Sequence, residues 1–308
     1  MNQNNNATGD NEPVRPRRGM GLARWIPYRL GSRLLGLFLG HPLLQAVILR
    51  RARRSFRAIC GQLGVRAWRP EFLLHLMSRL TIPWRVAKLS LADDATFWRW
   101  VGVENGELLA ERLAEGKGIL LVNCHTAIAR LTPLVVWRLG HELAVIEPEP
   151  YLRIMGARDA DRIRSITLRG QGEKFWMKEL YQAQKILLGQ GIVHLALDGH
   201  QGTGGVKREF LGQDRLFHVS LAQLAMQIGA DIVLVRALLD RQGRISVGFS
   251  GPLDTGSPDM PVETRLQRFL DHYVAYLEKL WHDHPGNISP RHLQHHFTSG
   301  VPQAGAAS

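Results

Sequence analysis

The sequence predicts an α/β protein in which a largely parallel central sheet is flanked by helices. Three observations lead to this fold class. Short apolar runs alternate with helical patterns, glycines close several of those patterns, and no apolar run is long enough for a polytopic membrane protein. The chain has 308 residues, of which 45% are hydrophobic and 21% charged, so it can bury a substantial core and is not disordered throughout.

The net charge of +12 lies entirely in the first part of the chain. Residues 1–90 contain 16 Lys and Arg against 3 Asp and Glu, whereas the remainder contains 23 against 24. A nucleic-acid-binding domain would carry its basic residues in a recognised binding motif, which is missing here. We therefore expect no nucleic acid as a partner, and an anionic surface as the partner of the N-terminal region.

Four regions follow from composition. Residues 1–18 are polar and rich in Asn, which predicts a disordered tail. Residues 19–60 form a basic, apolar helical segment, residues 61–297 form the main domain, and residues 298–308 form a second disordered tail.

The helical segment 19–60 has the character of a membrane-binding element. Its apolar run 34–49 is shorter than the roughly 20 residues of a spanning helix, and Pro42 interrupts it. Arginines lie on both sides, and Trp25 and Tyr28 precede the run. This combination favours helices lying in the interface of an anionic membrane. A helix pair in the core of a soluble domain and an imperfect single span are the alternatives.

The main domain alternates between apolar runs typical of strands and apolar residues at helical spacing. Apolar runs predict strands at 118–124, 143–146, 192–197, 232–239 and 245–249. Helical spacing predicts helices at 107–115, 134–139, 174–188, 219–228 and 262–281. Because strands and helices alternate, most neighbouring strands are expected to run parallel.

A histidine stands at the end of the first predicted strand. In open α/β sheets, function lies at the carboxyl ends of the strands, and His125 directly follows the run 118–124. A histidine there can act as a general base near neutral pH, and a purely structural histidine is the alternative. Cys124 points to the opposite face from His125, so the two do not readily form a nucleophile–base pair.

A second strand end is also rich in polar groups. Asp198 directly follows an apolar run, and the loop after it contains four glycines, among them Gly199 and Gly202. Glycines let the backbone approach a ligand closely, and Lys207 and Arg208 add cations suited to phosphate. The alternative is a flexible surface loop with incidental charges.

Several other site types are absent from the sequence. Neither nucleotide-binding glycine motif occurs, and there is no G-x-S-x-G nucleophile elbow. Cys60 and Cys124 form no zinc or disulfide pattern, which fits a reducing compartment. We expect no metal site, and we expect the C-terminal histidines to be solvated or to face lipid headgroups; these are His282, His284, His292, His295 and His296.

The order of these segments resembles a known family. The segments that carry the resemblance are GKGILLVNCH at 116–125, the helix end, strand and acidic turn at 187–199, Phe-Leu-Gly at 210–212, LAQLAMQIGADIVLV at 221–235, and His-Pro at 284–285. Together they resemble the bacterial lysophospholipid-acyltransferase-like family, in particular its late lipid A (lauroyl/myristoyl) acyltransferase branch. The resemblance runs from about residue 84 to residue 297.

The resemblance implies an acyltransferase at the cytoplasmic face of the bacterial inner membrane. A fatty acyl chain would pass from an acyl thioester, carried by an acyl-carrier protein or coenzyme A, to a lipid or glycolipid acceptor. No bound cofactor is implied. In the family, an acidic residue near the catalytic histidine orients its ring, and the histidine takes the proton of the acceptor hydroxyl.

The sequence departs from the family pattern at this acidic residue, because Arg130 stands where the acid is expected. Our hypothesis is that Arg130 and Glu147 exchange charges across the site, and that Glu147 or Asp198 orients His125. Arg130, together with Lys207 and Arg208, is then expected to bind a phosphate of the acceptor or of the acyl carrier. A degenerate site that only binds lipid or acyl carrier is one alternative, and an acyltransferase for an unusual acceptor such as an amine is another.

Overall fold

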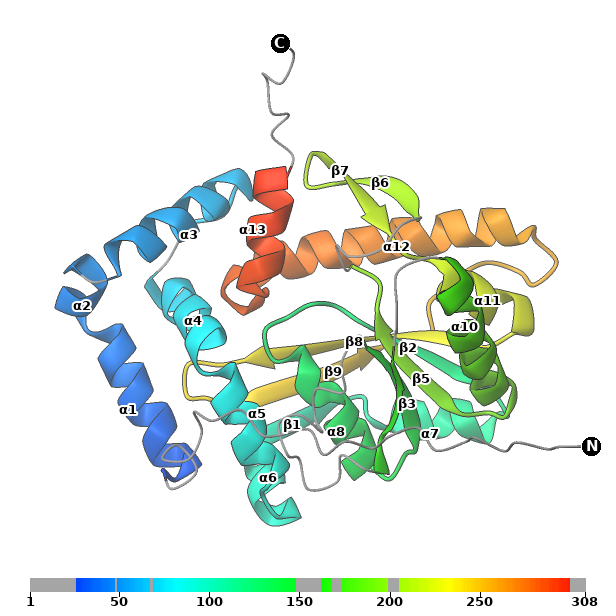
Figure 1. Cartoon of the computed structure of the whole chain (residues 1–308), viewed down its shortest axis with the longest axis horizontal. Coiled ribbons are helices and arrows are strands. Elements are labelled where there is room, and N and C mark those ends of the chain that lie inside the picture. Colours follow the sequence, from blue (N-terminus) through cyan, green and yellow to red (C-terminus); the bar gives the residue numbers. More distant parts are fainter. Residues whose placement is uncertain are drawn as a thin grey trace, which may run out of the picture.

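The computed structural model describes residues 26–47, 49–66, 69–147, 162–167, 173–198 and 205–299. A seven-stranded sheet with the order β1-β9-β8-β2-β5-β3-β4 forms its centre, with helices on both sides (Figure 1). The strands are β1 (Val101–Glu104), β2 (Ile119–Asn123), β3 (Leu143–Glu147), β4 (Arg164–Thr167), β5 (Ile192–Ala196), β8 (Asp231–Leu239) and β9 (Ile245–Ser250). All neighbours run parallel except β8 and β9, which confirms the largely parallel sheet.

The central strands are apolar on both faces because helices cover both faces. Along β2, Ile119 and Leu121 belong to one core, whereas Leu120 and Val122 belong to the other. The first core is completed by the N-terminal helices together with α7 (Glu107–Ala114) and α8 (Thr132–Arg138). The second is completed by α10 (Glu173–Leu188), α11 (Ser220–Ile228), α12 (Val262–Asp283) and α13 (Pro290–Ser299).

The N-terminal region forms a layer of six helices at one side of the sheet (Figure 1). They are α1 (Tyr28–Gly40), α2 (Pro42–Val47), α3 (Arg50–Gln62), α4 (Arg69–Leu80), α5 (Ile82–Ser90) and α6 (Asp94–Trp100). None of the helices in the described part of the chain combines the length and apolar character that crossing a bilayer requires.

A buried arginine fixes α1 to the rest of the protein. Arg85 on α5 is fully buried and donates to the hydroxyls of Tyr28 and Ser32 on α1, each at 3.0 Å. The Tyr28 hydroxyl in turn donates to the carbonyl of Gly243 in the turn between β8 and β9, at 2.7 Å. The Tyr28 ring stacks on Trp84 with centroids 5.3 Å apart. Helix α1, which lies within the expected membrane-binding segment, is therefore packed onto the domain.

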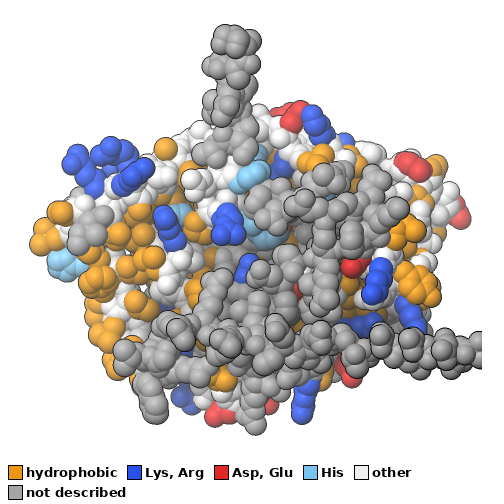
Figure 2. Space-filling model, viewed as in Figure 1, with side chains coloured by type: hydrophobic (Ala, Val, Ile, Leu, Met, Phe, Trp, Pro, Cys, Tyr) orange, Lys and Arg blue, Asp and Glu red, His pale blue; other side chains and the backbone are white. Residues whose placement is uncertain are grey.

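The outer surface of this layer is divided by residue type. Large apolar side chains on α1 and α2 are exposed, and arginines follow on α3, with hydrophobic and basic atoms adjacent at the same side of the molecule (Figure 2). The exposed apolar residues are Leu30, Leu34, Leu37, Phe38, Leu43 and Val47.

The helices and strands expected from the sequence between residues 107 and 283 are all present, with ends that differ by no more than two residues. The strands β1 and β4 were not predicted, because each is only four residues long and lies at an edge of the sheet. The prediction of a loop at Lys207 and Arg208 is wrong. Both belong to β6 (Val206–Phe210), which pairs with β7 (Gln213–Phe217) in a separate antiparallel hairpin. The predicted tail 1–18 lies outside the described residues.

Candidate active site

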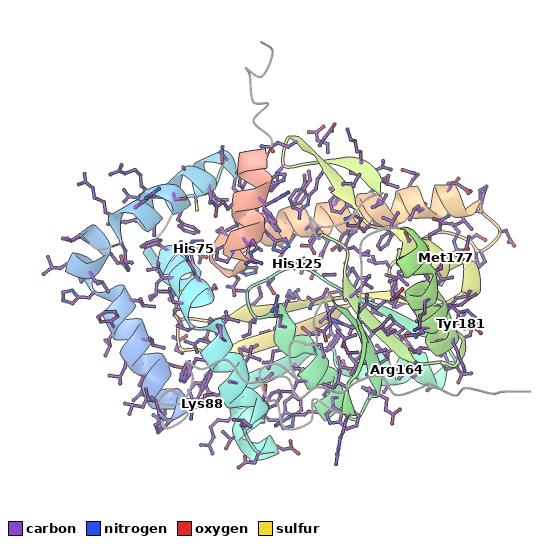
Figure 3. The ribbon with its side chains drawn as sticks, viewed as in Figure 1. His75, Lys88, His125, Arg164, Met177 and Tyr181 are labelled. Atoms are coloured by element: carbon purple, nitrogen blue, oxygen red, sulfur yellow. The ribbon has the colours of Figure 1, made fainter. Side chains whose placement is uncertain are left out.

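The pairing register of β2 and β5 brings His125 and Asp198 together. The two strands are parallel neighbours, and Asn123 at the end of β2 lies opposite Ala196 at the end of β5. His125 and Asp198 each lie two positions beyond these partners. Residues 73 apart in sequence therefore meet at the carboxyl edge of the sheet, where His125 lies beneath α12 and α13 (Figure 3).

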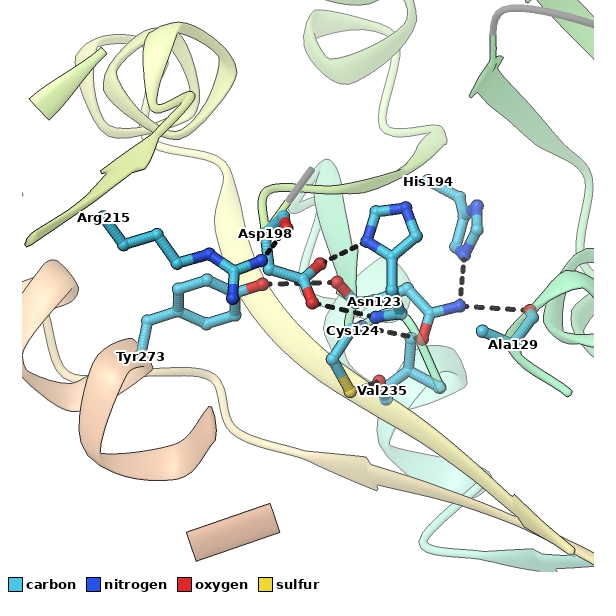
Figure 4. Close-up of polar contacts among 9 residues, drawn as sticks. Asn123, Cys124, Ala129, His194, Asp198, Arg215, Val235 and Tyr273 are labelled. Atoms are coloured by element: carbon cyan, nitrogen blue, oxygen red, sulfur yellow. Dashed lines mark hydrogen bonds and ion pairs between the residues drawn. The ribbon is translucent and has the colours of Figure 1, made fainter. Parts of the chain in front are cut away.

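Asp198 contacts both the ring and the backbone of His125. Figure 4 shows the polar contacts around Asp198. Its Oδ1 lies 2.6 Å from Nδ1 of His125, and its Oδ2 accepts the backbone N–H of His125 at 3.0 Å. The Asp198 side chain is 1% exposed, while that of His125 is 34% exposed. A carboxylate is an acceptor, so Nδ1 carries the hydrogen and Nε2 of the neutral ring is left as the basic atom.

The surroundings of Asp198 keep it ionised. Burial opposes ionisation, but the charge and hydrogen bond of His125 hold the pKa of the Asp198 carboxyl well below its usual value, with further help from His292 and Arg215. The carboxylate is thus available as an orienting group for the imidazole near neutral pH.

Arg215 supports Asp198 from the β6–β7 hairpin. Its Nη2 donates to the backbone carbonyl of Asp198. Its guanidinium lies over the rings of Phe210, Phe217 and Trp281, with centroid distances of 5.1, 5.8 and 5.4 Å. The sequence did not single out Arg215. Its position becomes evident only from its contacts with three aromatic rings, which lie on different elements, with Trp281 on α12.

Beneath the histidine lies a second polar layer. Asn123 Nδ2 points to the carbonyl of Ala129 at 3.1 Å, to the Thr132 hydroxyl at 3.2 Å and to His194 Nε2 at 3.1 Å. Burial, with a smaller effect from His125, lowers the pKa of His194 to about 3. His194 is therefore neutral and accepts at Nε2, and this network fixes the end of β2 from below. In the sequence, this layer is indicated by a histidine, His194, within the otherwise apolar run of β5.

Cys124 does not contribute a nucleophile to this arrangement. It is 1% exposed, and its Sγ lies 3.7 Å from the carbonyl of Val235 on β8. Burial, together with the negative charge of Asp198, raises the pKa of its thiol. Since the thiolate is the reactive form, the buried thiol is inert near neutral pH.

Comparison with known families identifies the family of the chain. The profile of the bacterial lipid A biosynthesis acyltransferases matches residues 80–275, which include β2, β5, His125, Asp198 and Arg215. The chain belongs to this family. Comparison with curated proteins gave no match.

A C-terminal segment that lies beyond the matched region contacts the candidate site. This segment runs from the short helix η4 (Pro285–Asn287) into α13. Ser289 N donates to the carbonyl of His125 at 3.0 Å, and Ala127 N donates to the carbonyl of Asn287 at 2.7 Å. The ring of His292 stacks on that of His125, with centroids 3.8 Å apart and planes 20° apart.

The expectation of solvated C-terminal histidines is wrong for two of them. His292 and His296 are 7% and 6% exposed, because α13 turns this face toward the domain. They are four residues apart and so share one helix face, which was a signal in the sequence. No group of metal-ligating side chains is found among the described residues.

The other predicted site residues are spread over several elements. Glu147 ends β3, one strand beyond β5, and accepts the Ser165 hydroxyl at 3.1 Å. Arg130 is exposed in the short helix η2 (Ala129–Leu131). Lys207 and Arg208 lie within reach of Asp214 and Asp271, at 4.0 and 3.5 Å. Gly199 and Gly202 lie outside the described residues.

Proposed function

We propose that this protein transfers a fatty acyl chain from an acyl thioester to a hydroxyl group of a lipid or glycolipid, with His125 as the general base. The observation that carries the proposal is the contact of 2.6 Å between His125 Nδ1 and Asp198 Oδ1 at the carboxyl edge of the sheet. It supports Asp198, rather than Glu147, as the orienting acid that Arg130 does not supply.

The proposed reaction begins with the proton of the acceptor. Nε2 of His125 removes this proton while Nδ1 keeps its hydrogen bond to Asp198. The acceptor oxygen attacks the thioester carbonyl, and the carbon–sulfur bond breaks as the tetrahedral intermediate collapses. The thiolate takes the proton back from His125, so the enzyme returns to its starting state. The products are the acylated lipid and the free thiol of the carrier.

The cations near the site are proposed to bind phosphate. Lys207 and Arg208 lie on β6, directly after the glycine-containing loop, and Arg130 follows the catalytic histidine by five residues. A phosphate lies on the phosphopantetheine arm of an acyl-carrier protein, on coenzyme A and on many lipid acceptors. We propose an acyl-carrier protein as the favoured donor, because an acidic protein is attracted to a basic N-terminal layer.

The N-terminal layer is proposed to lie on the cytoplasmic face of the inner membrane. Leu37, Phe38 and Leu43 on α1 and α2 are 74%, 62% and 69% exposed, which costs free energy in water but not in a lipid interface. Arginines 50, 51, 53, 54 and 57 on α3 adjoin them and would meet anionic headgroups. This surface would bring the acceptor lipid to the enzyme.

The test is acyl transfer by the full-length protein and by His125→Ala. Labelled acyl-carrier thioester and acyl-coenzyme A serve as donors, a membrane lipid extract serves as acceptor, and mass spectrometry identifies the product. We expect an acylated lipid with the wild type and a loss of about 10²- to 10⁴-fold with the variant. Absence of product from both proteins, with lipid binding intact, would contradict catalysis and favour a degenerate binding protein.

A further inference from the structure

We infer that His292 is a positioning residue for the general base: its ring, stacked on His125, holds the imidazole in the plane in which Nδ1 meets Asp198 and Nε2 meets the acceptor hydroxyl. The inference rests on the proposed function of His125. Neither the family match, which ends at residue 275, nor the sequence patterns assign a role to this residue.

The hydrogen bond to Asp198 alone does not define the ring plane. The torsion that rotates an imidazole is broad, and a single bond at Nδ1 restrains one point of the ring. The His292 ring covers a face of His125 at a centroid distance of 3.8 Å and an interplanar angle of 20°. A contact on the face resists tilting, which the bond at the edge does not, so the two contacts together fix both the plane and the direction of Nε2.

His292 is itself held in place, as a positioning residue must be. It is 7% exposed, and its neighbour Leu293 is fully buried. The backbone N–H groups of His292 and Leu293 both donate to the carbonyl of Ser289, at 2.9 and 3.0 Å, and form the first turn of α13. Ser289 N in turn donates to the carbonyl of His125 at 3.0 Å. One short segment therefore holds the backbone of His125 and also covers its ring.

The segment that carries His292 is anchored to the sheet. The side chain of Asn287 bridges the backbone of Leu239 at the end of β8, accepting from its N–H at 2.6 Å and donating to its carbonyl at 3.1 Å. Thr126 and Ile288 form an antiparallel bridge beside it. Because both rings are attached to the same rigid frame, the stack does not depend on an exposed and mobile helix end.

The same helix offers a matched control. His296 lies one turn after His292 and is equally buried, at 6%. Its ring packs on Phe210 and Trp281, with centroids 5.0 and 5.6 Å away, rather than on His125. Replacing either histidine by leucine removes the same atoms from the same helix face. Only the change at His292 removes a ring from the general base.

The kinetic test compares His292→Leu, His292→Phe and His296→Leu with the wild type in the acyl-transfer assay. We expect His292→Leu to lower kcat by about 10²-fold with KM for the acyl donor unchanged. We expect His292→Phe to restore most of kcat, because a phenyl ring keeps the stacked face without the nitrogens. We expect His296→Leu to lower the melting temperature without lowering kcat.

Three kinetic outcomes would overturn the inference. They are an unchanged kcat in His292→Leu, equal losses of kcat in His292→Leu and His296→Leu, and a His292→Phe protein that folds but is no more active than His292→Leu. The first would remove any role, the second would leave a purely structural role, and the third would assign the role to the nitrogens instead of the ring.

A spectroscopic measurement tests the positioning without any turnover. In the full-length protein, the hydrogen on His125 Nδ1 should give a low-field proton resonance, which is assigned by its loss in His125→Ala. We expect His292→Leu to broaden or shift this resonance and His292→Phe and His296→Leu to preserve it. An unchanged resonance in His292→Leu would overturn the inference. If the wild type transfers no acyl group, the proposed function fails and this measurement alone decides the positioning.

Discussion

The strands β5 and β3 are neighbours in the sheet and both lead into a carboxylate, yet the two carboxylates have different surroundings. Asp198, after β5, is buried and contacts the ring of His125, whereas Glu147, at the end of β3, accepts a hydrogen bond from Ser165 on the edge strand β4. The difference arises because β5 pairs with β2, the strand that carries His125, and β3 does not. In a parallel sheet, strand order decides which acid can serve which base.

Asp198→Asn should give the largest effect. The amide has no charge to stabilise the imidazolium that forms during proton transfer, and its single oxygen cannot accept from both Nδ1 and the backbone N–H of His125. We expect kcat/KM for acyl transfer to fall by about 10²- to 10⁴-fold, while a far-UV spectrum shows an intact fold. Full activity in Asp198→Asn would contradict the comparison, because the carboxylate after β5 would then contribute no more to catalysis than the one at the end of β3.

Arg215→Gln should have the next largest effect. It removes the donor to the Asp198 carbonyl and a positive charge that favours the ionised carboxylate. We expect a loss of about tenfold in kcat/KM, the size of one hydrogen bond to a charged group. Arg241→Gln, an exposed arginine in the turn between β8 and β9, is the control and should retain activity. Equal losses in both variants would point to net charge rather than to Asp198.

The buried histidine on β5, His194, predicts that stability depends on pH. At the level where β5 has His194, β3 has Val145. A histidine whose pKa is about 3 when folded and 6.5 when unfolded binds its proton only in the unfolded state between these values. The contribution of His194 to the free energy of unfolding is therefore fully present above pH 6.5. It decreases as the pH falls toward 3, by about 1.4 kcal/mol per pH unit.

His194→Gln tests the predicted increase of the unfolding free energy with pH. Glutamine can still accept from Asn123 but has no proton to bind, so the pH slope of the unfolding free energy should decrease by about 1.4 kcal/mol per unit. Denaturant titrations between pH 4 and about 6.5 measure it. Some slope should remain, since burial also lowers the pKa of His75 and of His296, each to about 4. An unchanged slope would mean that His194 is not neutral in the folded protein.

Glu147→Gln should give the smallest effect. The amide oxygen can still accept the Ser165 hydroxyl, so the cost in stability should be about 1 kcal/mol or less. We expect kcat/KM to stay close to that of the wild type. A loss as large as that of Asp198→Asn would support the hypothesis that Glu147, paired with Arg130, completes the site.

The local patterns of the sequence were sufficient for most of the sheet and its helices. The strands β2, β5 and β8 are predominantly apolar because both faces of the sheet are covered there, and Gly229 ends α11 in the left-handed conformation that its position after the helix indicates. Strand β1 could not be predicted, since its four residues become a strand only by pairing with β9, far along the chain. The hairpin β6–β7 was missed for a similar reason, because charged residues interrupt its alternation.

The sequence by itself determined which residues could carry the chemistry. His125 and Asp198 each follow an apolar run, and the carboxyl ends of such strands lie at one edge of a parallel sheet. The tertiary structure decided the pairing. The register that sets Asn123 opposite Ala196 brought Asp198 to the ring of His125, and the packing of α13 placed His292 on the same ring. These are contacts between residues 73 and more positions apart, and they depend on strand order and helix packing, which no local pattern of side chains specifies.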